Sequence, residues 1–183
     1  MFSICALSSA LRNKSPILIR NFHNTAIMSG FPIILIGIHS ELGAPIAQGL
    51  RKDGFDIIRQ IQSVPAAKAD LPHLLAGREP PNPPTNNVGS GEYGRPARAV
   101  LVGRGFTEAQ VNELRELFDS DAAEPVLWAA GKDTEKAKVQ ATMGSKNDDM
   151  PPPGYEKIIE NTMRGLLRSW VDRGAKEGEL VLY

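Results

Sequence analysis

Residues 31–55, FPIILIGIHSELGAPIAQGLRKDGF, decide the fold of this chain. Ile33–Ile36 is continuously apolar, and a strand without polar alternation is typical of a parallel sheet covered by helices on both faces. Gly37 ends this strand, and the Ser40 hydroxyl is expected to cap the helix that follows. An apolar stripe then recurs at a spacing of four residues: Leu42, Ile46 and Leu50. The stretch therefore predicts a strand, a turn, a helix and the start of a second strand.

Strands and helices go on alternating along the rest of the chain. The predicted strands are 55–61, 99–102, 126–130 and 180–182, and the predicted helices are 65–76, 107–118 and 155–171. Thr107 with Gln110 three residues on is a capping-box signature, and Gly174 fits the position just after the last helix. The expected buried stripes are Val111, Leu114, Leu117 and Phe118, and then Tyr155, Ile158, Ile159, Met163, Leu166, Leu167, Trp170 and Val171. This alternation predicts an α/β fold, a three-layer sandwich with a mostly parallel five-stranded sheet.

Composition and charge exclude several classes of protein. The chain has 183 residues, of which 42% are hydrophobic and 23% charged, as in an ordinary soluble globular domain. No apolar run approaches the ~20 residues that a membrane-spanning helix needs. The 21 basic and 21 acidic residues give no net charge, so there is no electrostatic case for nucleic-acid binding. Cys5 is the only cysteine, and no spacing typical of metal ligands is present.

Residues 1–29 have the composition of a mitochondrial presequence. They are rich in serine and contain three basic residues and no acidic one. Residues 20–25, RNFHNT, also resemble the R-x-F-x-x-S/T signal of the mitochondrial peptidases, which implies a first cut near Phe22 and a second after Ser29. The sequence thus predicts a targeting segment, a single α/β domain over residues 30–183 and a location in the mitochondrial matrix. The alternative is a start at Met28, which would give a cytoplasmic protein.

The first strand, turn and helix resemble those of the short-chain dehydrogenases and their Rossmann-fold relatives, over residues 31–61. The turn of that family reads T-G-x-x-x-G-x-G. In this chain Gly37 takes the place of the first glycine and Gly43 that of the last. The resemblance implies a Rossmann-like fold whose ligand lies at the carboxyl ends of the strands. As a whole, the chain resembles small Rossmann-type proteins of uncharacterised function.

The chain departs from the dehydrogenase pattern at positions that matter for catalysis. Glu41 replaces the middle glycine, which in the family lets the backbone approach the pyrophosphate. No acid for the ribose stands near residues 61–62. The family's catalytic Y-x-x-x-K is also missing, because neither Tyr93 nor Tyr155 has a lysine four residues on. The sequence therefore identifies no catalytic residue and leaves open whether the protein is an enzyme.

The loops after the predicted strands offer a modest basic rim at one edge of the sheet. The candidate ligand-binding residues are Gly37, His39, Ser40, Glu41, Gly43, Arg104 and Lys132. The leading interpretation is a Rossmann-like binding or accessory protein that holds a small anionic molecule, with no metal and no firmly predicted cofactor. The alternative is an NADP-dependent oxidoreductase that binds NADP in a shifted pose, with Arg59 or Arg104 on the 2′-phosphate. A third interpretation is partner binding through the Pro-rich loops, of which residues 78–96 also have the length of a lid.

Overall fold

Five parallel strands form the middle layer of the structure, a computed structural model that describes residues 30–134 and 154–183. The strands are β1 (Phe31–Ile36), β2 (Phe55–Ile61), β3 (Ala99–Val102), β4 (Leu127–Ala130) and β5 (Glu179–Leu182). They lie in the order β2-β1-β3-β4-β5, and each neighbouring pair is parallel. The predicted presequence, residues 1–29, and residues 135–153 lie outside the described residues.

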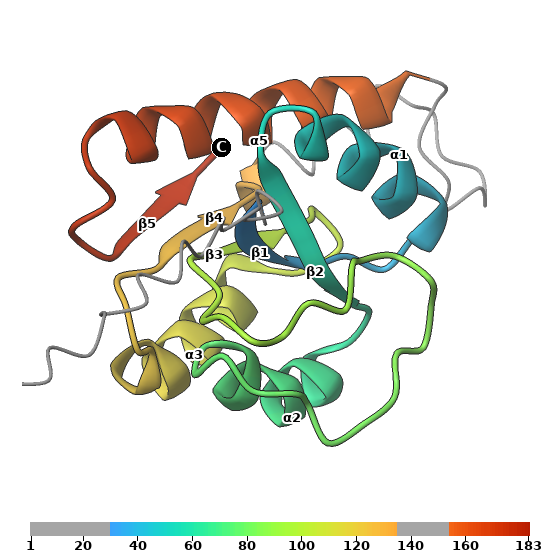
Figure 1. Cartoon of the computed structure of the whole chain (residues 1–183). Coiled ribbons are helices and arrows are strands. Elements are labelled where there is room, and N and C mark those ends of the chain that lie inside the picture. The colour runs from blue at the N-terminus through green and yellow to red at the C-terminus, as the bar shows by residue number, and fades with distance from the viewer. Residues whose placement is uncertain (1–29, 135–153) are drawn as a thin grey trace, which may run out of the picture.

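Helices cover both faces of this sheet (Figure 1). α1 (Ser40–Arg51) and α5 (Tyr155–Asp172) lie on one face, and α2 (Val64–Leu74), α3 (Glu108–Phe118) and the short helix η1 (Asp119–Asp121) belong to the other. The two faces bury separate apolar clusters, one around Leu50 and Trp170 and one around Leu71 and Trp128. The predicted three-layer, five-stranded Rossmann-like sandwich is confirmed, and its sheet is parallel throughout.

The apolar stripes fit the helices closely but not completely. Trp170 is 2% exposed and packs edge-to-face against Phe31, with ring centroids 5.9 Å apart. Leu117, expected to be buried, is 49% exposed because it lies six residues after Val111 and is thus rotated by roughly 120° around the helix. Ile158 and Val171 are exposed for the same reason, since each lies one residue off the face that carries Ile159, Met163, Leu167 and Trp170.

The helix boundaries test three predictions. The capping box at Thr107 and Gln110 is confirmed in both directions, and Gly174 follows α5 with a φ of +92°. The Ser40 cap is wrong. Ser40 is the first residue of α1, and His39 precedes it as the N-cap without a side-chain hydrogen bond to the helix. The start of α1 thus has no side-chain cap within the described residues.

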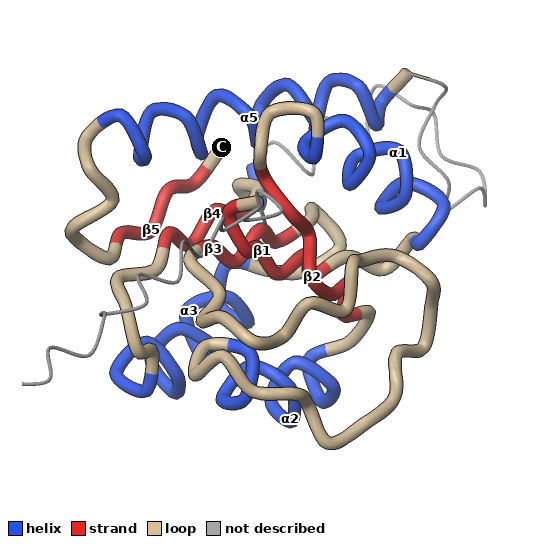
Figure 2. The backbone as a smooth tube through the Cα atoms, viewed as in Figure 1, coloured by secondary structure: helices blue, strands red, loops and turns tan. Residues whose placement is uncertain are grey.

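The long connection from α2 to β3 lies along the outer edge of β2 (Figure 2). Its residues 88–91, called the β2 strap below, bond to the free side of that strand. Gln60 N–H donates to Val88 O at 3.2 Å, Ser90 N–H to Ile57 O at 2.9 Å and Gly91 N–H to Ile58 O at 3.1 Å. Gly89 has a φ of +121°, and a Cβ there would lie 2.6 Å from Ile58 O. Only glycine therefore allows the strap to approach β2 this closely.

Candidate functional site

The predicted site residues lie in loops at one edge of the sheet. Because all strands are parallel, the loops after β1, β3 and β4 leave the sheet at the same edge. The chain reverses its direction of travel across the sheet between β1 and β3, and this switch point is where open α/β sheets bind ligands. His39, Arg104 and Lys132 each follow one of these strands, as predicted.

The turn after β1 is organised around Gln60, which sequence reasoning did not single out. Its Nε2 donates to Gly37 O at 2.9 Å and to His39 O at 3.1 Å. Gly43 of α1 faces the same amide, and a Cβ on Gly43 would lie 2.8 Å from Gln60 Cδ and closer still to Oε1. Gly43 therefore allows α1 to pack against a side chain of β2, which is also the packing role of the last glycine in the dinucleotide turn.

The N-terminus of α1 faces the same edge. Glu41 lies exposed in the first turn, where its negative charge interacts favourably with the positive end of the helix dipole. The neighbouring helices begin differently, because Ser63 caps α2 and Thr107 caps α3. In α3, Asp133 also accepts from Glu108 N–H, at 3.3 and 3.4 Å. Of the helices that follow β1, β2 and β3, α1 is thus the one whose first N–H groups lack a side-chain acceptor in the described part of the chain.

Arg104 extends from the end of β3 across β4 toward β5. A Cβ on Gly131 would lie 3.3 Å from Arg104 Nε and closer to Cγ, so Gly131 makes room for this side chain. The guanidinium carbon lies 5.7 Å from the ring centroid of Tyr183. Arg104 Nε is buried without a hydrogen-bond partner, and none of the acidic side chains that the structure describes pairs with Arg104.

The ring of Tyr183 lies against the guanidinium group of Arg104. Its hydroxyl donates to Val102 O at 3.2 Å, which ties the ring to β3. Burial raises the pKa of Tyr183 well above its usual value, against the opposing effect of the Arg104 charge. The phenol therefore stays neutral, and Arg104 lies over a ring that attracts its cation.

The predicted residues thus form two groups on the same edge. Gly37, His39 and Gly43 surround Gln60, with Ser40 and Glu41 beside them at the start of α1. Arg104 lies over Gly131 and Tyr183, and the exposed Lys132 follows, its N–H donating to Tyr183 O at 2.8 Å. A contact joins the groups, since a Cβ on Gly105 would lie 2.8 Å from Ile38 Cγ1, and Ile38 is 46% exposed.

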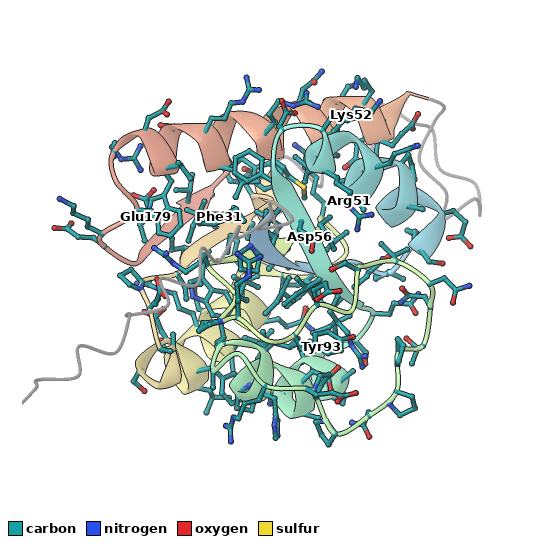
Figure 3. All side chains as sticks on the ribbon, in the orientation of Figure 1. Phe31, Arg51, Lys52, Asp56, Tyr93 and Glu179 are labelled. Carbon is teal, nitrogen blue, oxygen red and sulfur yellow. The ribbon has the colours of Figure 1, made fainter. Side chains whose placement is uncertain are left out.

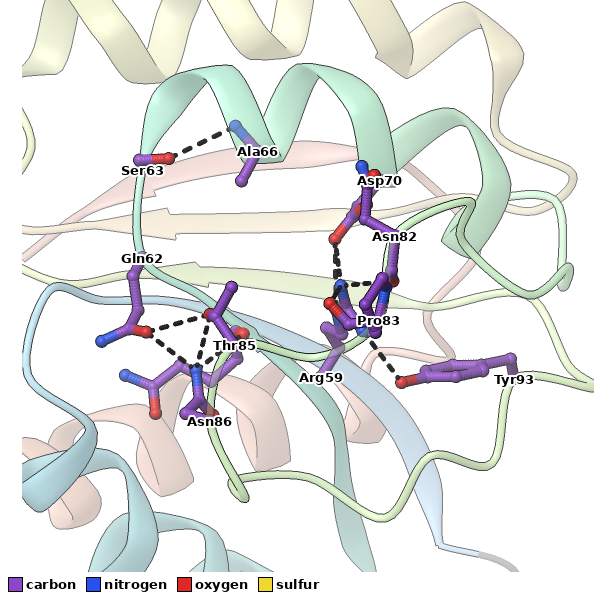
Figure 4. A network of polar contacts seen from close by, with 11 residues as sticks. Arg59, Gln62, Ser63, Ala66, Asp70, Asn82, Pro83, Thr85, Asn86 and Tyr93 are labelled. Carbon is purple, nitrogen blue, oxygen red and sulfur yellow. Dashed lines mark hydrogen bonds and ion pairs between the residues drawn. The ribbon is translucent and has the colours of Figure 1, made fainter.

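Arg59, the other predicted 2′-phosphate ligand, is enclosed between Asp70 of α2 and the loop that carries Asn82 and Tyr93 (Figure 4). Its Nε and Nη2 donate to Asp70 Oδ2 at 3.1 and 2.7 Å, and the two side chains are 5% and 2% exposed. Nη2 also donates to Asn82 O at 3.0 Å, and Nη1 donates to Tyr93 Oη at 3.4 Å. Arg59 therefore anchors the loop of residues 78–96 to β2, and the loop is attached along the strand rather than shaped as a free lid.

The residues at the expected cofactor positions do not fit a dinucleotide in the dehydrogenase pose. Gln62 occupies the position of the ribose-binding acid, and its amide donates to Ile38 O at 2.9 Å while its Oε1 accepts from Thr85 and Asn86. Glu41 places a carboxylate where the pyrophosphate would lie, and Arg59 is bonded elsewhere. In the described residues there is no cluster of three metal-ligating side chains, and none of the helices described is long and apolar enough to cross a membrane.

This fold and edge define an α/β protein of the Rossmann-like class. Comparison with known proteins adds one distant homologue, Kojic acid related protein 6 of Aspergillus oryzae (strain ATCC 42149 / RIB 40). It is 25% identical over 100 residues, which are 55% of this chain and 58% of that protein. The match thus spans little more than half of the relative's length. No family model and no solved structure matches the chain.

Proposed function

We propose that this protein binds a small anionic molecule at the carboxyl edge of its sheet, with Arg104 as the main contact. The observation that carries the proposal is the state of the Arg104 guanidinium, which is oriented by Tyr183 and Gly131 and has an unbonded, buried Nε. Arg104 is partly buried, and leaving its buried Nε donor without a partner is costly, so an anionic ligand that accepts from Nε would remove that cost. The exposed Lys132 adds a second positive charge nearby.

The start of α1 supports the same ligand class. Its N–H groups are free of a side-chain cap, and helix N-termini attract anions. Glu41 opposes this attraction, because its carboxylate competes for the same positive end. The balance favours a small anion near Arg104 over a dinucleotide, whose two phosphates would need the place of Glu41.

The proposal is tested by isothermal titration calorimetry of the purified protein with inorganic phosphate, NADP⁺ and NAD⁺. The name of the Aspergillus relative links that protein to kojic acid, so this compound belongs in the same series. Arg104→Ala should weaken binding of the best probe by about tenfold to a hundredfold, the loss expected for a charge-assisted hydrogen bond. Arg51→Ala is the matched control, because it removes one positive charge that is 60% exposed and pairs with Asp56.

A second variant, Glu41→Gln, tests whether Glu41 repels the ligand or contacts it. If Glu41 only repels the ligand, Glu41→Gln should strengthen binding. Micromolar NADP⁺ binding that is lost in Glu41→Gln would instead support the oxidoreductase with a shifted cofactor pose. Equal affinities of wild type and Arg104→Ala for every probe that binds would refute the proposed site.

A further inference from the structure

The two outer edges of the sheet differ in whether their backbone groups are hydrogen-bonded. At the β2 edge, the β2 strap takes up backbone groups of Ile57, Ile58 and Gln60. At the opposite edge, nothing in the described part of the chain pairs with the outer side of β5. Edge strands left open are templates for pairing with another chain, and most proteins block them.

The outward backbone groups of β5 belong to Leu180 and Leu182. Glu179 N–H donates to Val126 O at 3.2 Å and Tyr183 N–H donates to Ala130 O at 2.9 Å. Because the backbone groups of a strand point alternately to its two sides, Val181 also faces β4, whereas Leu180 and Leu182 face away. Each of these two leucines therefore presents one N–H and one C=O at the edge.

β5 is short, which limits pairing, but it lacks the residues that most often block an edge strand. The strand reads ELVL, with no proline or lysine, and all four residues are partly exposed. Its one charge, Glu179, pairs with Arg173 of the same chain and lies on the outer left side of Figure 3. The charge that would repel a neighbouring strand is therefore neutralised within the chain itself.

We propose that β5 pairs with β5 of a second copy of this chain, antiparallel and about a two-fold axis at Val181. In this register Leu180 lies opposite Leu182 of the second copy, and each pair exchanges two N–H···O bonds. The symmetry repeats both bonds on the other side of the axis, as an isologous interface requires. The two sheets then become one continuous sheet.

The side chains suit this register. Leu180 and Leu182 pack on the α2–α3 face of the sheet, so the four leucines of two copies would meet on that face. Val181 lies on the other face and would meet its own copy at the axis. Glu179 would lie opposite Tyr183 of the second copy, so that no like charges face each other directly. Because only short strands meet, we expect a weak dimer of small interface area.

The first experiment is sedimentation velocity of the full chain over a range of concentrations. Wild type should shift from monomer to dimer as the concentration rises. Leu182→Pro should stay monomeric, because proline removes an outward N–H that β4 does not use and is tolerated at such edge positions. Leu182→Ala is the matched control, which loses side-chain packing but keeps the N–H, and it should still dimerise.

The second experiment uses wild type alone and does not depend on the folding of a variant. Amide hydrogen exchange at Leu180 and Leu182 should be fast in dilute protein and slow in concentrated protein, whereas Val181 should be protected at both concentrations. Protection of both leucines in dilute monomer would show that the chain covers its own edge and would overturn the proposal. A monomer at every concentration, or a Leu182→Pro dimer as tight as wild type, would overturn it as well.

Discussion

The substitution Gly43→Ala tests whether the glycine of the first turn serves packing against Gln60. An alanine Cβ at position 43 would lie 2.8 Å from Gln60 Cδ and nearer still to its Oε1, so the amide must move. Gln60 would then lose its bonds to Gly37 O and His39 O. The effect is therefore expected in the free energy of unfolding, without any ligand.

Gly43→Ala changes the free energy of unfolding through contributions of opposite sign. Overpacking costs about 1–3 kcal/mol, and the two hydrogen bonds contribute about 0.5–1.5 kcal/mol each. Alanine in place of glycine favours a helix by about 1 kcal/mol. Gly43→Ala should therefore destabilise the protein by about 3 kcal/mol, and Gln60→Ala by a similar amount, because it leaves two carbonyls unbonded. In the double variant the clash is absent, so its loss should be about 2 kcal/mol, roughly 4 kcal/mol less than the sum of the single changes.

The assay is urea denaturation of wild type, both single variants and the double variant, followed by circular dichroism. Gly165→Ala is the control, because a Cβ on this exposed glycine of α5 would meet nothing within 4 Å. It should stabilise the protein by about 1 kcal/mol through helix propensity alone. If the losses in free energy of unfolding for Gly43→Ala and Gln60→Ala were additive, the packing argument would be refuted. Gly43 would then again be a candidate ligand-binding residue.

Four further outcomes are expected. Trp170→Ala should cost about 3–5 kcal/mol in the same urea assay, since it deletes a fully packed side chain. Burial opposes ionisation of Glu160, but hydrogen bonds from Lys157 and Arg164 outweigh this effect and lower the pKa of Glu160. The free energy of unfolding should therefore fall as the pH drops below about 4.5, and it should fall less in Glu160→Gln. Arg59→Met should cost about 3–5 kcal/mol and expose residues 78–91 to proteases, and Arg59→Met with Asp70→Leu should recover much of the stability. If residues 1–29 are a presequence, mass spectrometry of protein from mitochondria should find a start near Gly30, and an intact Met1 would contradict this.

Local patterns were sufficient to predict most of the fold. The unbroken apolar run of β1 and the capping box of α3 act over a few residues, and each led to the correct element. Predictions were less secure for the exact position of a residue in a helix. Ser40 lies one residue inside the helix that it was expected to cap, and Leu117 lies on the exposed side of α3, away from Val111.

The parts of the site that were not predicted rest on contacts between distant residues. Gln60 bonds to a turn more than twenty residues earlier, and Arg59 bonds to a loop more than twenty residues later. Such contacts leave no periodic pattern. A signal was nevertheless present, because β2 contains three polar residues, Asp56, Arg59 and Gln60, in a strand that is buried throughout. Buried polar groups need partners, and this rule would have indicated a structural role for each of them, including Arg59, which was instead predicted as a phosphate ligand.

Those three residues also narrow the choice of ligand contacts. Asp56 accepts from Arg51 and from the Ser90 hydroxyl of the β2 strap, Arg59 anchors the loop at Asn82, and Gln60 holds the turn after β1. Each polar side chain buried in β2 is therefore bonded within the protein. Gln60 Oε1 is also buried without a partner, but Gln60 is held by the two bonds of its Nε2. Arg104 differs, because its position is fixed by a ring and a glycine, and its buried Nε has no partner among the described residues. A side chain that is held in place but not bonded is the one that a ligand can use without breaking the fold, and this makes Arg104 the decisive residue for binding tests.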